Sequence, residues 1–137
     1  MKYRRAYNWK YQLVEDESYT TSIKPLQSLV IKGVGTLSSE GEIILFKGYA
    51  WDGASGPTHD DETNLKPSAK HDFLYQLIRL GLLDISLRRL IDKELVQECL
   101  DRGMNKVRAK LWDKGLLIVG KFACLPRKEE RVIFEVF

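Results

Sequence analysis

Two short segments hold most of the residue types in this chain that could carry out chemistry. One is a glycine-rich stretch, Gly48-Tyr-Ala-Trp-Asp-Gly-Ala-Ser-Gly-Pro57, and the other is His71-Asp-Phe-Leu-Tyr75. Glycine tolerates positive φ, so the first stretch can expose backbone carbonyl groups, to which Asp52 could add a carboxylate around a hard cation. The competing interpretation is a tight turn that buries Trp51 in the core and is capped by Asp52.

The second segment places an imidazole, a carboxylate and a phenol close together. On a helix, His71 and Tyr75 share a face because they are one turn apart, whereas Asp72 points about 100° away. His71 and Tyr75 are therefore candidate catalytic residues, and Asp72 is a candidate metal ligand together with Asp52 and Gly53. The competing interpretation is a histidine that is merely hydrogen-bonded at the edge of a core.

Asp92 falls in an apolar helical pattern, where a carboxylate needs a partner. If the helices on either side of residues 83 and 84 form a hairpin, Asp92 approaches Tyr75 and lies within reach of His71. An aspartate bonded to one imidazole nitrogen fixes the tautomer and leaves the other nitrogen free to act as a base. Asp92 is therefore the third candidate catalytic residue. The competing interpretation is a surface ion pair between Arg88 and Asp92 at i,i+4.

Helices are expected to position these groups. Apolar residues at helical spacing predict a first helix over about 67–80, with Pro67 in its first turn and Gly81 after its end. Ser86 is expected to cap a second helix, and Gly103 to stop it. Because only a short turn separates them, the two helices should pack antiparallel.

A third helix is predicted to begin near Asn105 and to end before Pro126. Its apolar pattern consists of Val107, Leu111, Trp112, Leu116 and Val119. Gly115 and Gly120 weaken the helix and indicate close backbone packing. Lys114 to Arg127, apolar in the middle and basic at the edges, could lie on a membrane surface, although an ordinary core helix is favoured.

The first 50 or so residues are predicted to form strands. Alternating residues carry this prediction, namely Trp9, Tyr11, Leu13, Tyr19 and Ile23. Residues 29–31 and 43–46 are short apolar runs, residues 48–66 form a long irregular loop of the kind that is often functional, and residues 131–137 look like a last strand. The expected fold is α+β, a single domain over 1–137: an N-terminal antiparallel sheet region, an antiparallel helix pair, a third helix and a short C-terminal strand.

Composition narrows the function classes. The chain has 137 residues and a net charge of only +3, and its basic residues are spread along the sequence, so a nucleic-acid partner is not indicated. The N-terminus lacks the apolar stretch of a signal peptide, and no run approaches the length of a transmembrane segment. Cys99 and Cys124 have no metal-ligand spacing and are expected to be buried free thiols of a reducing compartment.

Taken together, these residues resemble an uncharacterised phage and prophage family, the domain of unknown function DUF1353. The family pattern is a G-[YF]-x-x-D-x-A-S-x-P loop, an H-D-x-L-Y helix and an R-x-x-x-D helix. The matching residues are Gly48, Tyr49, Asp52, Ala54, Ser55, Pro57, His71, Asp72, Leu74, Tyr75, Arg88 and Asp92, followed by Gly103 and Arg108. The resemblance covers roughly residues 27 to 120, and it implies a phage or prophage origin and a place in the host-cell cytoplasm, but no particular activity.

A more distant resemblance is to secreted and parvoviral phospholipases of the A2 type, which share the order of glycine-rich loop, H-D-x-x-Y and a later helical aspartate. It implies that Asp72 and loop carbonyls near Asp52 and Gly53 hold Ca²⁺, that His71 activates water, and that Asp92 orients His71. The G-x-G calcium loop and the disulfides of the secreted enzymes are absent, and a β-rich half replaces their leading helix.

Three functions stay open at this point. The first is a phage accessory protein with a calcium-dependent, metal-assisted ester hydrolase site, acting on a lipid or another ester. The second is a non-enzymatic lysis, tail or host-interaction protein that binds a host or virion protein and in which the cluster is structural. The third is a metal-dependent phosphohydrolase that would add His59 to His71, Asp72 and Asp92.

Overall fold

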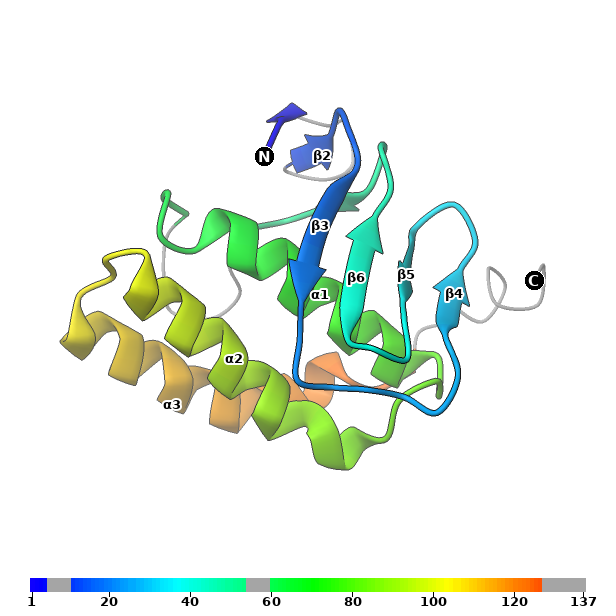
Figure 1. Ribbon diagram of the computed structural model, residues 1–137. Coiled ribbons are helices and arrows are strands. Elements are labelled where there is room, and N and C mark those ends of the chain that lie inside the picture. The colour runs from blue at the N-terminus through cyan, green and yellow to red at the C-terminus, as the bar shows by residue number, and fades with distance from the viewer. Residues whose placement is uncertain (5–10, 54–59, 127–137) are drawn as a thin grey trace. The chain divides into compact units, whose positions relative to one another are not determined.

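The computed structural model describes residues 1–4, 11–53 and 60–126 (Figure 1). Backbone contacts divide the chain into two compact units, of which the first includes Met1–Asp52 and the second begins at Gly53. In the described residues, the first unit is built from antiparallel strands and the second from helices. The predicted α+β class is therefore confirmed, while the single domain stays a prediction.

Two antiparallel sheets make up the first unit. The smaller sheet has the order β1-β2-β7, with β1 Tyr3–Arg4, β2 Tyr11–Leu13 and β7 Ala50–Trp51. The larger sheet has the order β3-β6-β5-β4, with β3 Glu17–Thr20, β6 Glu42–Leu45, β5 Gly35–Leu37 and β4 Leu29–Ile31. β2, β3, β4 and β6 match the predicted strands, whereas β1, β5 and β7 contain none of the residues that carried that prediction.

Alternation gives the larger sheet one buried face. Tyr19 of β3 pairs with Ile43 of β6, and Ile43 pairs with Leu37 of β5. All three side chains are buried, which forms an apolar row across the sheet.

The smaller sheet buries aromatic rings. Trp51 is 1% exposed, and its ring centroid lies 5.5 Å from that of Tyr11 on the neighbouring strand. This agrees with the competing interpretation of the glycine-rich segment in one respect, namely that Trp51 lies in the core. The irregular loop predicted over 48–66 is wrong at both ends, because Ala50 and Trp51 pair with β2 and because the first helix already begins at Leu65.

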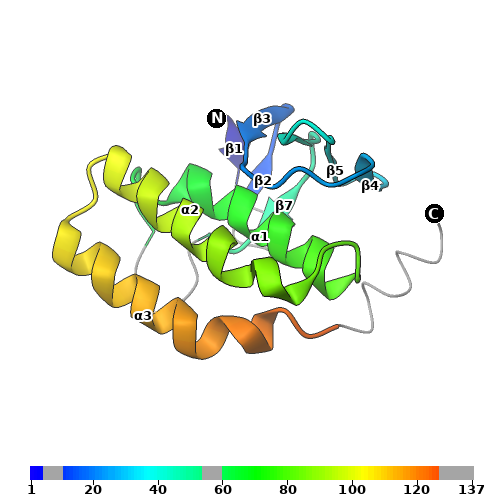
Figure 2. The same cartoon turned by 60° about the horizontal axis from the view of Figure 1, so that its bottom comes forward.

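Three α-helices and one short 3₁₀ turn make up the described part of the second unit (Figure 2). They are α1 Leu65–Arg79, η1 Ile85–Leu87, α2 Arg88–Asp101 and α3 Lys106–Ala123. The predicted first helix agrees within two residues at its start and one at its end. Gly81 and Gly103 follow the ends of α1 and α2 with φ of 77° and 101°, a conformation in which glycine stops a helix.

The helix starts show one cap at the predicted start of the third helix and test the cap predicted at Ser86. Asn105 caps α3, since its side chain accepts hydrogen bonds from the backbone N–H groups of Val107 and Arg108 at 2.8 and 3.2 Å. The predicted cap at Ser86 is wrong. Asp84 has the extended backbone that a cap requires, and its carboxylate accepts from the Ser86 N–H at 2.8 Å, so Ser86 lies inside the 3₁₀ turn.

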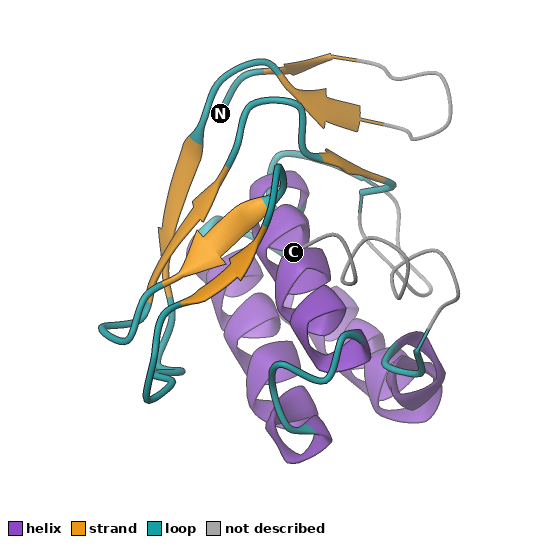
Figure 3. Ribbon diagram, turned by 90° about the vertical axis from the view of Figure 1, so that its right-hand side faces the viewer, coloured by secondary structure: helices purple, strands orange, loops and turns teal. Residues whose placement is uncertain are grey.

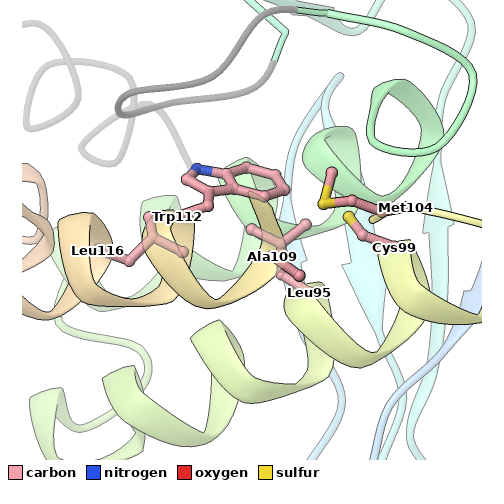
Figure 4. Close-up of a cluster of buried hydrophobic side chains, with 6 residues drawn as sticks. All are labelled: Leu95, Cys99, Met104, Ala109, Trp112 and Leu116. Atoms are coloured by element: carbon pink, nitrogen blue, oxygen red, sulfur yellow. The ribbon is translucent and has the colours of Figure 1, made fainter. Parts of the chain in front are cut away.

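The second unit is a small helical layer (Figure 3). α2 packs against both α1 and α3, and Figure 4 shows the apolar cluster between α2 and α3. Its members are Leu95, Cys99, Met104, Ala109, Trp112 and Leu116. Three other residues of the pattern predicted for α3 are exposed instead, namely Val107, Leu111 and Val119.

Both cysteines match their prediction. Cys99 and Cys124 are free and buried, and burial raises the pKa of the Cys99 thiol to about 12 and that of Cys124 to about 11. Both thiols are therefore protonated at neutral pH, which is the less reactive form of cysteine.

No helix in the described ranges is long and apolar enough to cross a bilayer. Several sequence predictions lie outside the described residues. They concern Trp9, the motif residues Ala54, Ser55 and Pro57, His59, and the strand at 131–137.

Candidate functional site

Asp92 is the centre of a polar cluster inside the second unit. It lies on α2 and is 0% exposed. Its Oδ1 is 2.9 Å from Nε2 of His71 and accepts a hydrogen bond of 2.5 Å from the hydroxyl of Tyr75, both on α1. Lys70, nearer the start of α1, contacts Glu98 near the end of α2, so the two helices run antiparallel as predicted. The predicted approach of the three side chains is confirmed as well.

Two arginines contact the other oxygen of the same carboxylate. Oδ2 of Asp92 is 2.7 Å from Nη1 of Arg89 and 3.4 Å from Nη1 of Arg88. Arg89 also reaches Asp113 of α3 at 2.9 Å, and Arg88 donates to the carbonyl of Leu116 at 3.0 Å. The interpretation of Arg88 and Asp92 as a surface pair is wrong, because the carboxylate is completely buried and links all three helices.

The second ring nitrogen of His71 faces a different acid. Its Nδ1 lies 3.8 Å from Oδ1 of Asp72, which is too far for a direct hydrogen bond. The His71 side chain is 3% exposed and that of Asp72 is 27% exposed. Because the Asp92 carboxylate can only accept, Nε2 must carry a hydrogen, and in neutral His71 the available lone pair is on Nδ1.

The charges around the ring set its protonation. Burial on its own lowers the pKa of His71, but the nearby negative charges of Asp72 and Asp92 and the hydrogen bond to Asp92 outweigh it and raise this pKa above its usual value. Burial raises the pKa of Asp92, yet His71, Tyr75 and Arg89 together hold it below the usual range. Burial and the bond to Asp92 also raise the pKa of Tyr75, so its phenol keeps its proton. The cluster therefore favours an imidazolium against an ionised carboxylate.

Gly120 explains how α3 approaches this cluster. A Cβ at this position would lie 2.6 Å from the hydroxyl of Tyr75 and 2.9 Å from Nη1 of Arg88. Close backbone packing at Gly120, predicted from the sequence, is confirmed, and α3 runs directly past the Tyr75 hydroxyl.

Other ionic contacts were not foreseen from the sequence. Lys70, 4% exposed on α1, bonds to Glu98 and lies 3.4 Å from Glu94 of α2. Arg108 of α3 bonds to Asp61, whose pKa is about 2 because the bonds from Thr63 and Arg108 outweigh its burial. A charged residue inside an apolar pattern, as at Lys70, was the signal that could have revealed them.

Arg89 and Asp113 extend the central cluster and were also missed. Arg89 is three residues before Asp92, a spacing at which helical side chains meet. Asp113 neighbours the buried Trp112 and bonds to Arg89 and Lys93, each at 2.9 Å. Both positions had the same signal as Asp92, a charge beside a buried stripe.

The three residues predicted as metal ligands lie in different parts of the chain. Asp72 belongs to the cluster, Gly53 begins the second unit next to the carboxylate of Asp60, and Asp52 ends the first unit. Within residues 1–4, 11–53 and 60–126, no group of three or more His, Cys, Asp or Glu side chains could hold a metal ion.

The arrangement can perform one kind of chemistry with its own groups. An imidazole oriented through Nε2 by a buried aspartate, with its Nδ1 3.8 Å from Oδ1 of Asp72, can accept a proton from water when it is neutral. Tyr75 holds the same oxygen of Asp92 and so restricts the orientation of the pair. No protein-family model, curated protein or solved structure matches the chain.

Proposed function

We propose that the chain is a hydrolase of ester bonds in which His71 is the general base. The supporting observation is the 2.9 Å contact between Nε2 of His71 and the buried Asp92, with Nδ1 on the opposite side of the ring. The family resemblance implies a phage or prophage accessory protein of the host-cell cytoplasm. The substrate that we propose for it is a lipid or another ester.

The proposed step uses only water and the side chains of the cluster. Nδ1 of neutral His71 takes a proton from a water molecule while the water oxygen bonds to the ester carbonyl carbon. The carbon–oxygen bond to the alcohol then breaks, and the proton on Nδ1 passes to the departing alkoxide. Asp92 stabilises the imidazolium that exists between the two transfers, and Tyr75 is a positioning residue for Asp92.

The raised pKa of His71 makes the proposal specific about pH. Only the neutral ring can accept a proton, so turnover is expected to rise with pH through the raised pKa of His71. Neutralising Asp72 removes one of the two negative charges that raise this pKa. The D72N variant should therefore reach its maximal rate at a lower pH than the wild type.

The assay is release of fatty acid from phospholipid liposomes and of alcohol from short-chain esters, with calcium and with a chelator. Calcium dependence is a prediction that rests on the resemblance to phospholipases. The difference in rate between the assay with calcium and the assay with a chelator tests it. The key variant is His71→Gln, whose amide can still donate to Asp92 but cannot act as a base at neutral pH. We expect a folded protein with a loss of rate of about a hundredfold or more.

Asn105→Ser is a matched control, because it retains a helix cap far from the cluster in sequence and should leave the rate unchanged. Hydrolysis that survives His71→Gln at the wild-type rate would contradict the proposed role. Absence of hydrolysis by the wild type on both substrate types, with and without calcium, would remove the proposal.

A second candidate is a non-enzymatic phage protein in which the cluster is structural. The observation that favours it is that the cluster is buried and its polar groups are satisfied. His71 is 3% exposed, and in the described residues no buried side-chain nitrogen or oxygen lacks a hydrogen-bond partner. It predicts that His71→Gln changes stability alone. The phosphohydrolase has no comparable support, since His59 lies outside the described residues.

A further inference from the structure

The outward face of α3 carries an apolar stripe that no other described element covers. It consists of Val107, Leu111, Ile118 and Phe122, which we call the outer stripe. Each of these side chains is more than half exposed, from 58% for Leu111 to 68% for Val107. Their spacing places them on one side of the helix over about 22 Å. A continuous exposed apolar surface of this kind marks an interaction site.

Lysines line one edge of that stripe. Lys110, Lys114 and Lys121 are exposed and lie roughly 70° around the helix from the outer stripe. We call them the lysine row. The lysine stems are aliphatic and can lie along an apolar surface while the ammonium groups reach its polar border.

No acid of α3 itself offsets these charges on the outer side of the helix. The acidic residue of α3 is Asp113, which is engaged on the inner side by Arg89 and Lys93. Arg108 is likewise directed to Asp61. The exposed charges of α3 are therefore lysines, and the chemistry that complements the face is apolar in the middle and anionic at the edge.

We propose that this face of α3 binds the surface of an anionic lipid bilayer, with the helix lying in the plane of the membrane. The outer stripe would enter the boundary between headgroups and acyl chains, and the lysine row would contact lipid phosphates. The opposite side of α3 cannot share this role, because Trp112 and Leu116 are buried against α2. The helix therefore lies on the bilayer and does not cross it.

Charge argues against a second copy of the chain as the occupant. A symmetric antiparallel pairing of two outer stripes would place both lysine rows on the same side, where like charges repel. A bilayer that contains anionic lipid supplies the opposite charge all along the helix. This inference does not depend on the proposed hydrolase, because binding is measured without turnover.

The test is co-sedimentation of the full chain with large vesicles of phosphatidylcholine alone or with phosphatidylglycerol added. We expect partition to the anionic vesicles and a fall in this partition as salt screens the lysines. The variant I118Q/F122Q removes apolar surface with little change in helix propensity and should weaken partition by about tenfold or more. Its control is L26Q/V30Q, which changes two exposed apolar residues of the first unit.

Charge is tested separately. K114E/K121E should lower partition to anionic vesicles about tenfold or more, whereas K32E/K47E makes the same change in net charge at exposed positions of the first unit and should not. Circular dichroism verifies that each variant keeps its helices. Equal partition to neutral vesicles, or equal loss in variant and control pairs, overturns the proposal. So does a dimer in analytical ultracentrifugation that I118Q/F122Q dissociates, since the occupant would then be a second copy.

Discussion

Replacing Gly120 by alanine tests the geometry of the cluster directly. The new methyl carbon would lie 2.6 Å from the Tyr75 hydroxyl and 2.9 Å from Nη1 of Arg88, both closer than non-bonded atoms approach. Neither group can move freely, because Tyr75 is bonded to Asp92 and Arg88 to the carbonyl of Leu116. Alanine must therefore displace the hydroxyl from Asp92 or push α3 away.

The magnitude follows from two opposing effects. Alanine is favoured over glycine within a helix by about 1 kcal/mol. Overpacking costs about 1–3 kcal/mol, and weakening a hydrogen bond to a charged group costs about 1.5–3 kcal/mol. The net expectation for Gly120→Ala is a loss of about 1–3 kcal/mol in the free energy of unfolding.

A double-mutant cycle isolates the cause. In a Tyr75→Phe background the nearest clashing atom is gone, and the ring carbon that carried it would lie 3.6 Å from the new methyl, an ordinary contact. The loss caused by Gly120→Ala should then be smaller than in the wild type by about 1 kcal/mol or more, because only the contact with Nη1 of Arg88 remains. Urea unfolding followed by the helical circular dichroism signal measures all four proteins. Equal losses in the two backgrounds, or a gain in the wild type, would refute the proposed contact.

Two further predictions concern the protonation of His71 and the start of α3. Because the folded pKa of His71 is raised above its usual 6.5, its stabilising contribution is complete below about pH 6.5 and is lost as pH rises through the folded pKa. Urea unfolding at a series of pH values should show this loss in the wild type and not in His71→Gln, and a parallel pH dependence of the two would contradict it. Asn105→Ala removes the acceptor for the Val107 and Arg108 N–H groups and should reduce the free energy of unfolding by about 1 kcal/mol. Asn105→Asp keeps an acceptor and should retain most of the stability of the wild type. Equal losses of stability in the two variants would exclude the cap.

The helices of the second unit could be predicted because their signals are local. Apolar spacing located α1, α2 and α3, and Gly81, Gly103 and Asn105 marked their ends. The pairing of His71 with Asp92 followed from one added step, which was folding the first two helices into a hairpin. Ser86 failed as a cap because Asp84, two residues earlier, caps the 3₁₀ turn that precedes α2, and its carboxylate accepts from the Ser86 N–H, so Ser86 already lies inside that turn.

Contacts that depend on three helices at once could not be derived in this way. Arg89 bonds to Asp92 of its own helix and to Asp113 of α3, and the second bond depends on the register between α2 and α3. The same register decides which apolar residues of α3 are buried. The sequence pattern therefore included Val107 and Leu111 with Trp112 and Leu116, although only the latter two face α2.

The charges that hold the three helices together also constrain any chemistry at His71. Asp92 and Asp72 stabilise the imidazolium, and this raises the pKa of the ring that must be neutral to act as a base. At neutral pH this arrangement stabilises the fold, which suits a structural cluster. It also keeps His71 protonated, so a catalyst that needs the neutral ring becomes active only when the pH rises or the charge of Asp72 is compensated. The two roles therefore differ in a measurable way. In a catalyst, the pKa seen in kcat/KM is the pKa of His71 titrated by NMR in the free protein, and D72N lowers both together. In a purely structural cluster, D72N lowers the pKa of His71 measured by NMR, but no enzymatic rate changes with that pKa.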